Sequence, residues 1–195
     1  NEGYYFVNWT EGDTEVSTDA AYTFTVTSDP TLVANFSLNS YTISASVNPE
    51  NSGSITGTGE YDHGTSVTLT ATANEGHTFI NWTEGDTEVS TNASYTFIAT
   101  DNRTLVANFS VHSYTISAYV NPEGAGTISG AGEYDHGTLV TLTAIANEGY
   151  TFINWTEGGI EVSSDASYSF TATVNRFLVA NFSIIVYTIS VSVNP

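Results

Sequence analysis

The chain has 195 residues, of which 21 are Asp or Glu, two are Arg and none is Lys or Cys. The net charge of −19 excludes a nucleic-acid-binding protein, because contact with phosphate requires clustered Lys and Arg. The absence of Cys excludes disulfides and thiolate metal sites. The chain also has no apolar run of about 18 residues, so we expect no membrane insertion in this segment.

The sequence repeats with a period of 73 residues, which is typical of a tandem array of equivalent folding units. The clearest landmarks at this spacing are aromatic: Trp9, Trp82, Trp155, Phe36, Phe109 and Phe182. In chain order we expect the C-terminal part of a repeat over 1–40, complete repeats over 41–113 and 114–186, and the first strand of a further repeat over 187–195. The chain is therefore expected to be a window on a longer array.

Four segments of each complete repeat alternate apolar and polar side chains, which predicts β-strands with one buried face. In the first complete repeat these segments are 41–49, 65–73, 94–100 and 104–110, and shorter strands are expected at 53–57 and 78–83. Segments rich in Gly, Asn, Asp and Pro, which favour turns, separate the strands at 48–54, 57–64, 73–76 and 84–94. The predicted fold class is all-β, a tandem array of small β-sandwich or β-grasp-like repeats with five to seven short strands each.

A ten-residue block with a central Trp occurs three times, as GYYFVNWTEG, GHTFINWTEG and GYTFINWTEG. Strict alternation would place Phe79 and Trp82 on opposite faces of a strand, unless the strand contains a bulge. We predict that these aromatic residues, with Phe152 and Trp155 in the next copy, form the structural core. The alternative is a row of Trp or Tyr rings that stack on sugars.

Acidic side chains near two turns are weak candidates for cation binding. Asp62 and Asp135 lie in the EYDHG segments next to one His, and Asp86 lies in EGDTE, where carboxylates alternate. Neither segment has the ligand set of a zinc site or of a twelve-residue calcium loop. We therefore expect no metal site or cofactor beyond weakly bound calcium, and no catalytic residues.

The sequence N-x-S/T, the acceptor motif for N-glycosylation, occurs repeatedly. Asn92 and Asn102 lie in predicted loops and are the best expected acceptors. The copies at Asn8, Asn81 and Asn154 lie beside Trp in a predicted strand, where a glycosylating enzyme reaches them less easily.

Three quoted stretches carry a family resemblance: YTISASVNP, GSITGTGEYDHGTSVTLTATANEGHTFINWTEG and YTFIATDNRTLVANFS. Together they resemble the divergent branch of the internalin-type B repeats, also called Listeria–Bacteroides repeats, over the whole 73-residue period. The resemblance implies secreted or surface-attached proteins of bacteria and archaea, in which such repeats serve as stalks, spacers or adhesive segments. It implies no catalytic motif, and the better-known branch has a β-grasp-like fold.

Two classes of function agree with these observations. The first is structural: an extracellular or cell-surface stalk of stacked repeats, or a filament in which 187–195 completes the 1–40 unit of a neighbouring copy by strand addition. Its partners would be copies of itself or neighbouring repeats. The second is adhesion, in which weak contacts with surface glycans or a partner protein add along the array.

Overall fold

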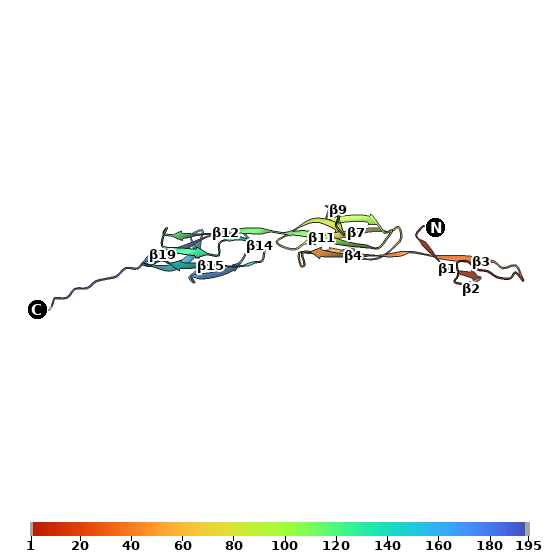
Figure 1. Cartoon of the computed structure of the whole chain (residues 1–195), viewed down its shortest axis with the longest axis horizontal. Coiled ribbons are helices and arrows are strands. Elements are labelled where there is room, and N and C mark those ends of the chain that lie inside the picture. The colour runs from red at the N-terminus through yellow and green to blue at the C-terminus, as the bar shows by residue number, and fades with distance from the viewer. Residues whose placement is uncertain (1, 194–195) are drawn as a thin grey trace. The chain divides into compact units, whose positions relative to one another are not determined.

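The computed structural model describes residues 2–193, and Figure 1 shows strands joined by turns and loops. The described part of the chain contains no helix, so it has no helix that is long and apolar enough to cross a membrane. The predicted all-β class is confirmed. The chain forms two compact units, one of residues 1–74 and 78–110, the other of residues 75–77 and those from 111 onward.

Each complete repeat contains eight strands. In the first complete repeat the strands are β4 (Ser40–Asn48), β5 (Gly53–Thr56), β6 (Gly59–Asp62), β7 (Ser66–Ala73), β8 (His77–Glu84), β9 (Thr87–Ser90), β10 (Ser94–Ile98) and β11 (Arg103–Val111). In the second they are β12 (Ser113–Asn121), β13 (Gly126–Ser129), β14 (Gly132–Asp135), β15 (Leu139–Ala146), β16 (Tyr150–Glu157), β17 (Ile160–Ser163), β18 (Ser167–Thr171) and β19 (Arg176–Ile184).

The number of strands exceeds the predicted five to seven because two strands lie in segments that we assigned to turns. β6 lies within 57–64 and β9 within 84–94, and each has four residues. Both are edge strands of one sheet, in which the backbone of the neighbouring strand supplies the hydrogen bonds. The Gly, Glu and Asp of β6 are unfavourable for a strand, so sheet pairing overrides local propensity there, whereas β9 (TEVS) is short and lies between Gly- and Asn-containing turn segments.

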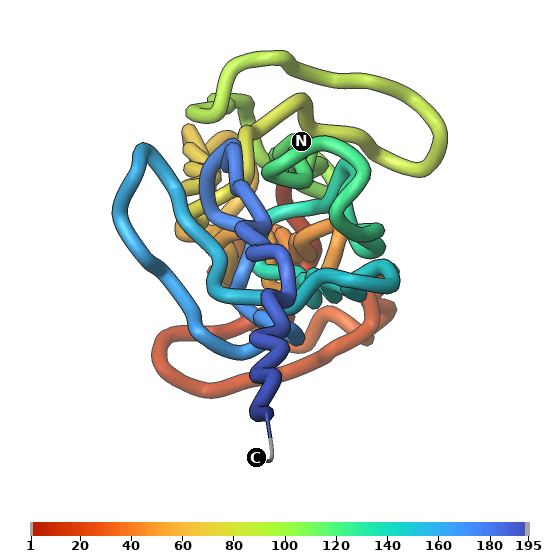
Figure 2. Tube along the Cα trace, turned by 90° about the vertical axis from the view of Figure 1, so that its left-hand side faces the viewer, coloured from red at the N-terminus to blue at the C-terminus, as the bar shows by residue number. Residues whose placement is uncertain are grey.

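The eight strands of a complete repeat form two sheets of five and three strands. The orders are β6-β4-β11-β8-β9 and β10-β7-β5, and the second complete repeat has the same arrangement. β4 and β11, the first and last strands of the repeat, pair in parallel at the centre of the larger sheet. The segment with β9 and β10, yellow-green in Figure 2, runs out as a wide loop and crosses from one sheet to the other.

Apolar side chains of the two sheets form one core in each complete repeat. The buried members in the first are Ile43, Val67, Leu69, Ala71, Trp82, Ala99, Leu105, Ala107 and Phe109, and the second has the corresponding set together with Ala125. Strands of the smaller sheet contribute alternate residues, such as Val67 and Leu69 of β7, as the period-two pattern predicts. The core therefore lies between the sheets of a small β-sandwich.

A β-bulge explains how both aromatic residues of the repeated block face inward. The register between β16 and β19 shifts between Phe152 and Asn154, so that Phe152 pairs with Phe182 and Trp155 with Ala180. Ile153, the residue at the shift, is about half exposed. The extra residue reverses the alternation once and lets Phe152 and Trp155 pack on the same core.

The 1–40 segment forms a single sheet of three strands, β1 (Tyr4–Glu11), β2 (Thr14–Ser17) and β3 (Leu32–Leu38), in the order β2-β1-β3. Phe36, which we expected in the core, is 55% exposed. The expectation fails at this position because the described residues of the segment provide no second sheet to cover it. Phe109 and Phe182, at the equivalent positions of the complete repeats, are almost fully buried.

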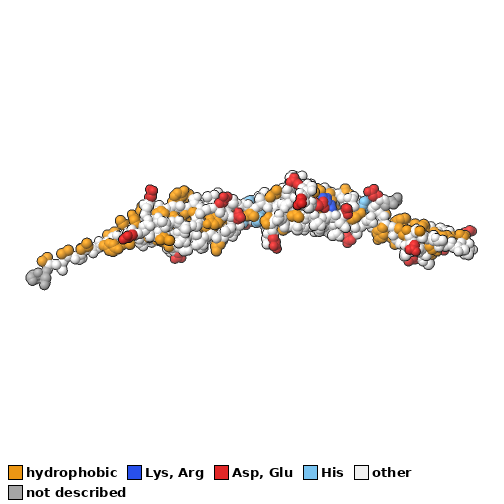
Figure 3. Space-filling model, viewed as in Figure 1, with side chains coloured by type: hydrophobic (Ala, Val, Ile, Leu, Met, Phe, Trp, Pro, Cys, Tyr) orange, Lys and Arg blue, Asp and Glu red, His pale blue; other side chains and the backbone are white. Residues whose placement is uncertain are grey.

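Residues 187–193, part of the segment expected to begin a further repeat, belong to no sheet of the described chain. Their apolar side chains are largely exposed, including Tyr187, Ile189 and Val191. The last two positions of the predicted segment lie outside the described residues. The acidic side chains are scattered over the visible face rather than gathered in one patch (Figure 3), in agreement with a dispersed negative charge.

Candidate functional site: polar clusters and junctions of the repeat

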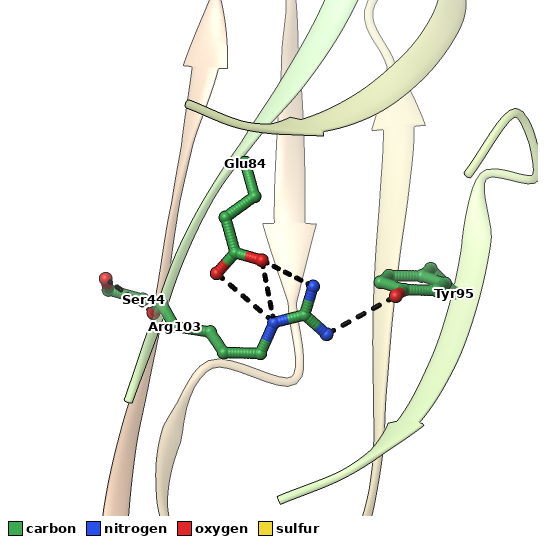
Figure 4. Close-up of polar contacts among 4 residues, drawn as sticks. All are labelled: Ser44, Glu84, Tyr95 and Arg103. Carbon is green, nitrogen blue, oxygen red and sulfur yellow. Dashed lines mark hydrogen bonds and ion pairs between the residues drawn. The ribbon is translucent and has the colours of Figure 1, made fainter. Parts of the chain in front are cut away.

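The chain has two Arg residues and no Lys. Arg103 and Arg176 lie at equivalent positions of the two complete repeats, and each is the centre of a polar cluster. In Figure 4, Arg103 at the start of β11 reaches across to Glu84 at the end of β8. Its Nε donates to both carboxylate oxygens of Glu84 at 3.2 and 3.1 Å, and its Nη2 donates to Oε2 at 2.7 Å. Ser44 of β4 donates to the backbone carbonyl of Arg103 at 3.2 Å.

The same guanidinium contacts the smaller sheet. Nη1 donates to the Tyr95 hydroxyl at 3.3 Å, and the guanidinium carbon lies 4.3 Å from the ring centroid of Phe97, both on β10. The side chain of Arg103 is therefore a bridge between the two sheets, made of a charge-assisted pair and a cation–π contact. The hydrogen bond from Arg103 lowers the pKa of Glu84, and the same bond raises the pKa of Arg103.

The second complete repeat reproduces the cluster. Arg176 donates to Glu157 from Nε and Nη2 at 3.0 and 2.6 Å and to the Tyr168 hydroxyl at 3.2 Å, and it covers Phe170 at 4.2 Å. In the 1–40 segment Pro30 stands at the equivalent position. Sequence analysis missed this cluster, although two lone cations at one repeat position were a usable signal.

A second polar cluster, here called the amide ladder, crosses the larger sheet. In the first complete repeat Asn48 donates to Asn108 at 3.0 Å, Asn108 to Asn81 at 2.9 Å, and Asn81 to Glu88 at 2.6 Å. These residues lie on the neighbouring strands β4, β11, β8 and β9. Each amide NH₂ points to the next strand, and the series ends on a carboxylate, the strongest acceptor.

The amide ladder recurs in all three copies. The second complete repeat contains it as Asn121, Asn181, Asn154 and Glu161, and the 1–40 segment as Asn35, Asn8 and Glu15. Ladders of this kind join neighbouring strands through side chains in addition to the backbone. Their presence in each copy indicates a role in holding the sheet.

The ladder accounts for the position of several N-glycosylation motifs. Asn8, Asn81 and Asn154 are ladder members whose amide groups donate and accept within the sheet. The side-chain oxygen of Asn102 accepts the backbone N–H of Thr42 at 2.8 Å. Asn92 lies exposed in the bend between β9 and β10. Glycosylation at these positions stays a prediction; Asn92 and Asn102 are exposed, whereas Asn8, Asn81 and Asn154 are half-buried.

The Trp side chains are structural in their surroundings. Trp82 and Trp155 are fully buried, and their indole N–H groups donate to the backbone oxygens of Ala93 and Ala166 at 3.2 and 3.3 Å. Trp9, in the single-sheet segment, is half-buried and makes the corresponding contact with Ala20 at 3.4 Å. Phe79 and Phe152 are half-buried and pack against the cores.

The acidic candidates for cation binding lie apart from one another. Asp62, Asp135 and Asp86 are exposed, and no group of three His, Asp or Glu residues in the described chain has the arrangement of a metal site. In the EGDTE segment the flanking carboxylates have other roles, since Glu84 binds Arg103 and Glu88 ends the amide ladder. In this segment Glu84 and Glu88 are therefore engaged in hydrogen bonds within the repeat.

One exposed aromatic pair is specific to the second complete repeat. Tyr119 and Phe177, on the neighbouring strands β12 and β19, stack at 4.6 Å between ring centroids and are 53% and 56% exposed. Ser46 and Thr104 stand at these positions in the first complete repeat. The sequence signal was the replacement of two polar residues by aromatic residues between otherwise similar copies.

Backbone hydrogen bonds connect the turn before the Trp strand of one copy with the next copy. In the first unit, Asn39 donates to the Gly3 carbonyl and His63 donates to the Asn39 carbonyl, both at 2.8 Å. In the second unit, His112 donates to Gly76 and His136 donates to His112, again at 2.8 Å. A single linking residue between two long strands thus joins the Asn-Glu-Gly turn to the EYDHG turn.

Comparison with known proteins gives one family and one distant relative. A family model, the divergent InlB B-repeat domain, matches residues 1–40, 43–113 and 114–186, and this family is a repeat domain without catalytic function. A protein of Evansella cellulosilytica named "Putative membrane protein" is 27% identical over 158 residues, which is 79% of this chain and 23% of the relative. The chain thus spans less than a quarter of that relative's length.

No solved structure matches the chain. InlB B-repeats are typical of surface and secreted bacterial proteins. With the family model covering nearly every residue from 1 to 186, the chain belongs to the divergent InlB B-repeat family and carries three tandem copies of the domain.

Proposed function

We propose that the chain is a structural segment of an extracellular or cell-surface protein, in which equivalent β-sandwich repeats add up to a stalk. The observation that carries the proposal is the use of the repeated side chains. The Trp residues, the Arg–Glu pairs and the amide ladders all serve packing within a repeat. Because these repeated residues stabilise the repeat itself, we infer that the function of the array is to provide length.

The junctions support the same proposal. Residues 75–77, which comprise the turn after β7 and the first residue of β8, belong to the compact unit of the second complete repeat. Neighbouring copies therefore share hydrogen bonds rather than being joined only by a flexible linker. Such coupling between nearest neighbours gives repeat arrays their cooperative stability.

Small-angle X-ray scattering on arrays of two, three and four complete repeats tests the stalk. The maximum dimension is expected to rise by a constant step per added repeat. A dimension that grows as the square root of repeat number, as for beads on a flexible linker, would contradict the proposal.

A filament made by strand sharing is the finer form of the structural proposal. Residues 187–193 repeat the sequence pattern of β12 and are unpaired, and β3 lies at the edge of its sheet in the described chain. In a complete repeat the strand equivalent to β3 pairs in parallel with the first strand. Sedimentation of the chain with and without 187–195 tests this form, which predicts association only when the segment is present.

Adhesion is the second candidate, and the stacked pair Tyr119 and Phe177 is the observation that favours it. Exposed aromatic rings are enriched where proteins bind partners or sugars. Binding to a glycan array is the test, with Tyr119→Ser and Phe177→Thr as the matched control, because these are the residues of the preceding copy. Equal binding by the chain and the double variant would exclude this surface.

A further inference from the structure

We infer that the His of the EYDHG turn is the residue that docks each repeat onto the preceding copy, by seating its imidazole on the Gly of the preceding Asn-Glu-Gly turn. The inference rests on the proposed function, because it names the contact that would hold a stalk together. The contact occurs twice, as Gly3 with His63 and as Gly76 with His136.

The space between each of the two glycine Cα atoms and the imidazole is large enough only for a hydrogen atom. A Cβ at Gly76 would overlap ring carbons Cγ and Cδ2 of His136, and a Cβ at Gly3 would overlap the same two atoms of His63. Both glycines are buried and have positive φ angles of 75° and 80°. The His ring therefore packs flush against the backbone of the turn, which any larger side chain would prevent.

The His ring is held by packing rather than by polar contacts of its buried nitrogen. Nδ1 of His63 and Nδ1 of His136 are buried and have no hydrogen-bond partner in the described chain. Each ring also lies 6.0 Å from a tyrosine ring, Tyr41 or Tyr114, on the first strand of its own repeat. The imidazole thus fills the space between the preceding turn and its own repeat.

The main chain around the contact is arranged to present the two turns to each other. The linking residue His112 donates to the Gly76 carbonyl and accepts from the backbone N–H of His136. The ring contact and these two hydrogen bonds form one continuous junction. Loss of the ring contact should therefore expose the two amides to solvent.

No EYDHG turn follows the third turn of the same kind within the 195 residues of this chain. Gly149 has a φ of 83°, close to that of Gly76, and its carbonyl likewise accepts from the linking residue, here Ile185 at 2.7 Å. It is exposed, and nothing lies within 4 Å of a Cβ built on it. The positive φ is thus common to all three turns, and in this chain only Gly3 and Gly76 also meet an imidazole.

This difference provides a matched pair of variants in the full chain. Gly76→Ala introduces both the backbone strain of a positive φ and the overlap with His136, and Gly149→Ala introduces only the strain. Hydrogen exchange is measured at the amide that donates to the carbonyl of the substituted glycine, which is His112 for G76A and Ile185 for G149A. We expect exchange at His112 to be at least about tenfold faster in G76A, and the change at Ile185 in G149A to be clearly smaller.

A rescue experiment separates docking from general damage to the turn. In a His136→Ala background the overlap is absent, so adding G76A should change exchange no more than G149A changes it in the parent chain. A G76A effect that is equal to that of G149A in the parent chain, or undiminished in the H136A background, would overturn the inference. The result is independent of the scattering test, which can fail for a docked array that bends elsewhere.

Discussion

Arg103 and Glu84 form a bidentate pair in which Nε contacts both carboxylate oxygens and Nη2 contacts Oε2 at 2.7 Å. About a third of the Glu84 side chain is accessible to solvent, 36% against 18% for Arg103. An exposed pair contributes little by charge alone, so its value lies in the geometry. The Arg is fixed from two directions, by the carboxylate in one sheet and by Tyr95 and Phe97 in the other.

We predict that replacing Arg103 by Lys destabilises the first complete repeat by roughly 1–2 kcal/mol, because Lys lacks the planar fork that bonds Glu84 and stacks on Phe97. Urea denaturation followed by the fluorescence of Trp82 measures the change. A matched comparison uses two equivalent Glu residues. Glu11 occupies the position of Glu84 in the copy that has Pro30 in place of Arg, so it has no Arg partner at that position. Glu84→Gln should destabilise the chain and Glu11→Gln should not, and equal effects would contradict the assigned role.

The same cluster predicts a dependence of stability on pH. The hydrogen bond from Arg103 lowers the pKa of Glu84 below its ordinary value of 4.5, and Arg176 lowers the pKa of Glu157 in the same way. A carboxyl group with a lowered pKa in the folded state stabilises the fold above its unfolded pKa, and this contribution is lost as pH falls through the folded pKa. We expect the stabilisation to be fully present above about pH 5 and to decline below it.

Urea unfolding between pH 7 and pH 3 checks this, with the E84Q/E157Q double variant as reference. Relief of repulsion among the other acidic groups acts on both proteins, so the difference between them isolates the two pairs. The difference should shrink as pH falls below about 4.5. A constant difference over the whole range would show that the pairs do not carry the acid sensitivity.

The amide ladder gives a prediction that depends on hydrogen-bond direction. Asn181 accepts from Asn121 and donates both to Asn154 at 2.9 Å and to Thr156 at 3.0 Å. Asn181→Asp preserves size but removes both donors and sets a carboxylate against the Asn154 carbonyl oxygen. We expect a loss of about 1–3 kcal/mol in the free energy of unfolding.

Asn92→Asp is the control, because Asn92 is exposed and Asp165 occupies its position in the next copy. It should leave the unfolding midpoint within about 0.5 kcal/mol of the parent chain. If N181D changed the free energy of unfolding as little as N92D, the amide ladder would not contribute to stability.

The sequence was sufficient to predict the parts of the fold that depend on its periodic patterns, namely the spacing of the repeats and the alternation of apolar residues along strands. The 73-residue repeat, the four alternating strands and the all-β class depend on patterns that a single chain displays, and the structure has them. The short edge strands β6 and β9 were missed because each has only four residues and lies within a segment rich in turn-forming residues, and pairing with β4 and β8 makes them strands. Such pairing is a tertiary effect that local composition does not encode.

The polar clusters were missed for a related reason. Arg103 and Glu84 are 19 residues apart, and Asn48 and Asn108 are 60 apart, so neither pair forms a local motif. The parallel pairing of β4 with β11 brings the two Asn residues together, and that topology is not visible in the hydrophobic pattern. The bulge at Ile153 was foreseen only as one way to bury two aromatic residues, because its position depends on the partner strand.

The environment of the indole rings gives the last prediction. Trp82 and Trp155 are fully buried and donate to backbone oxygens, whereas Trp9 is half-buried in a segment without a second sheet. We expect the fluorescence of Trp82 and Trp155 to be blue-shifted and shielded from acrylamide, and that of Trp9 to be red-shifted and quenched. Single-Trp variants, with Phe at the other two positions, separate the three signals.

Because truncating a fully buried Trp removes its packing and leaves a cavity, Trp155→Ala should lower the free energy of unfolding by about 3–5 kcal/mol, and Trp9→Ala by clearly less. Ready quenching of Trp155, or an equal cost at the two positions, would mean that the rings are available to a ligand rather than part of the core.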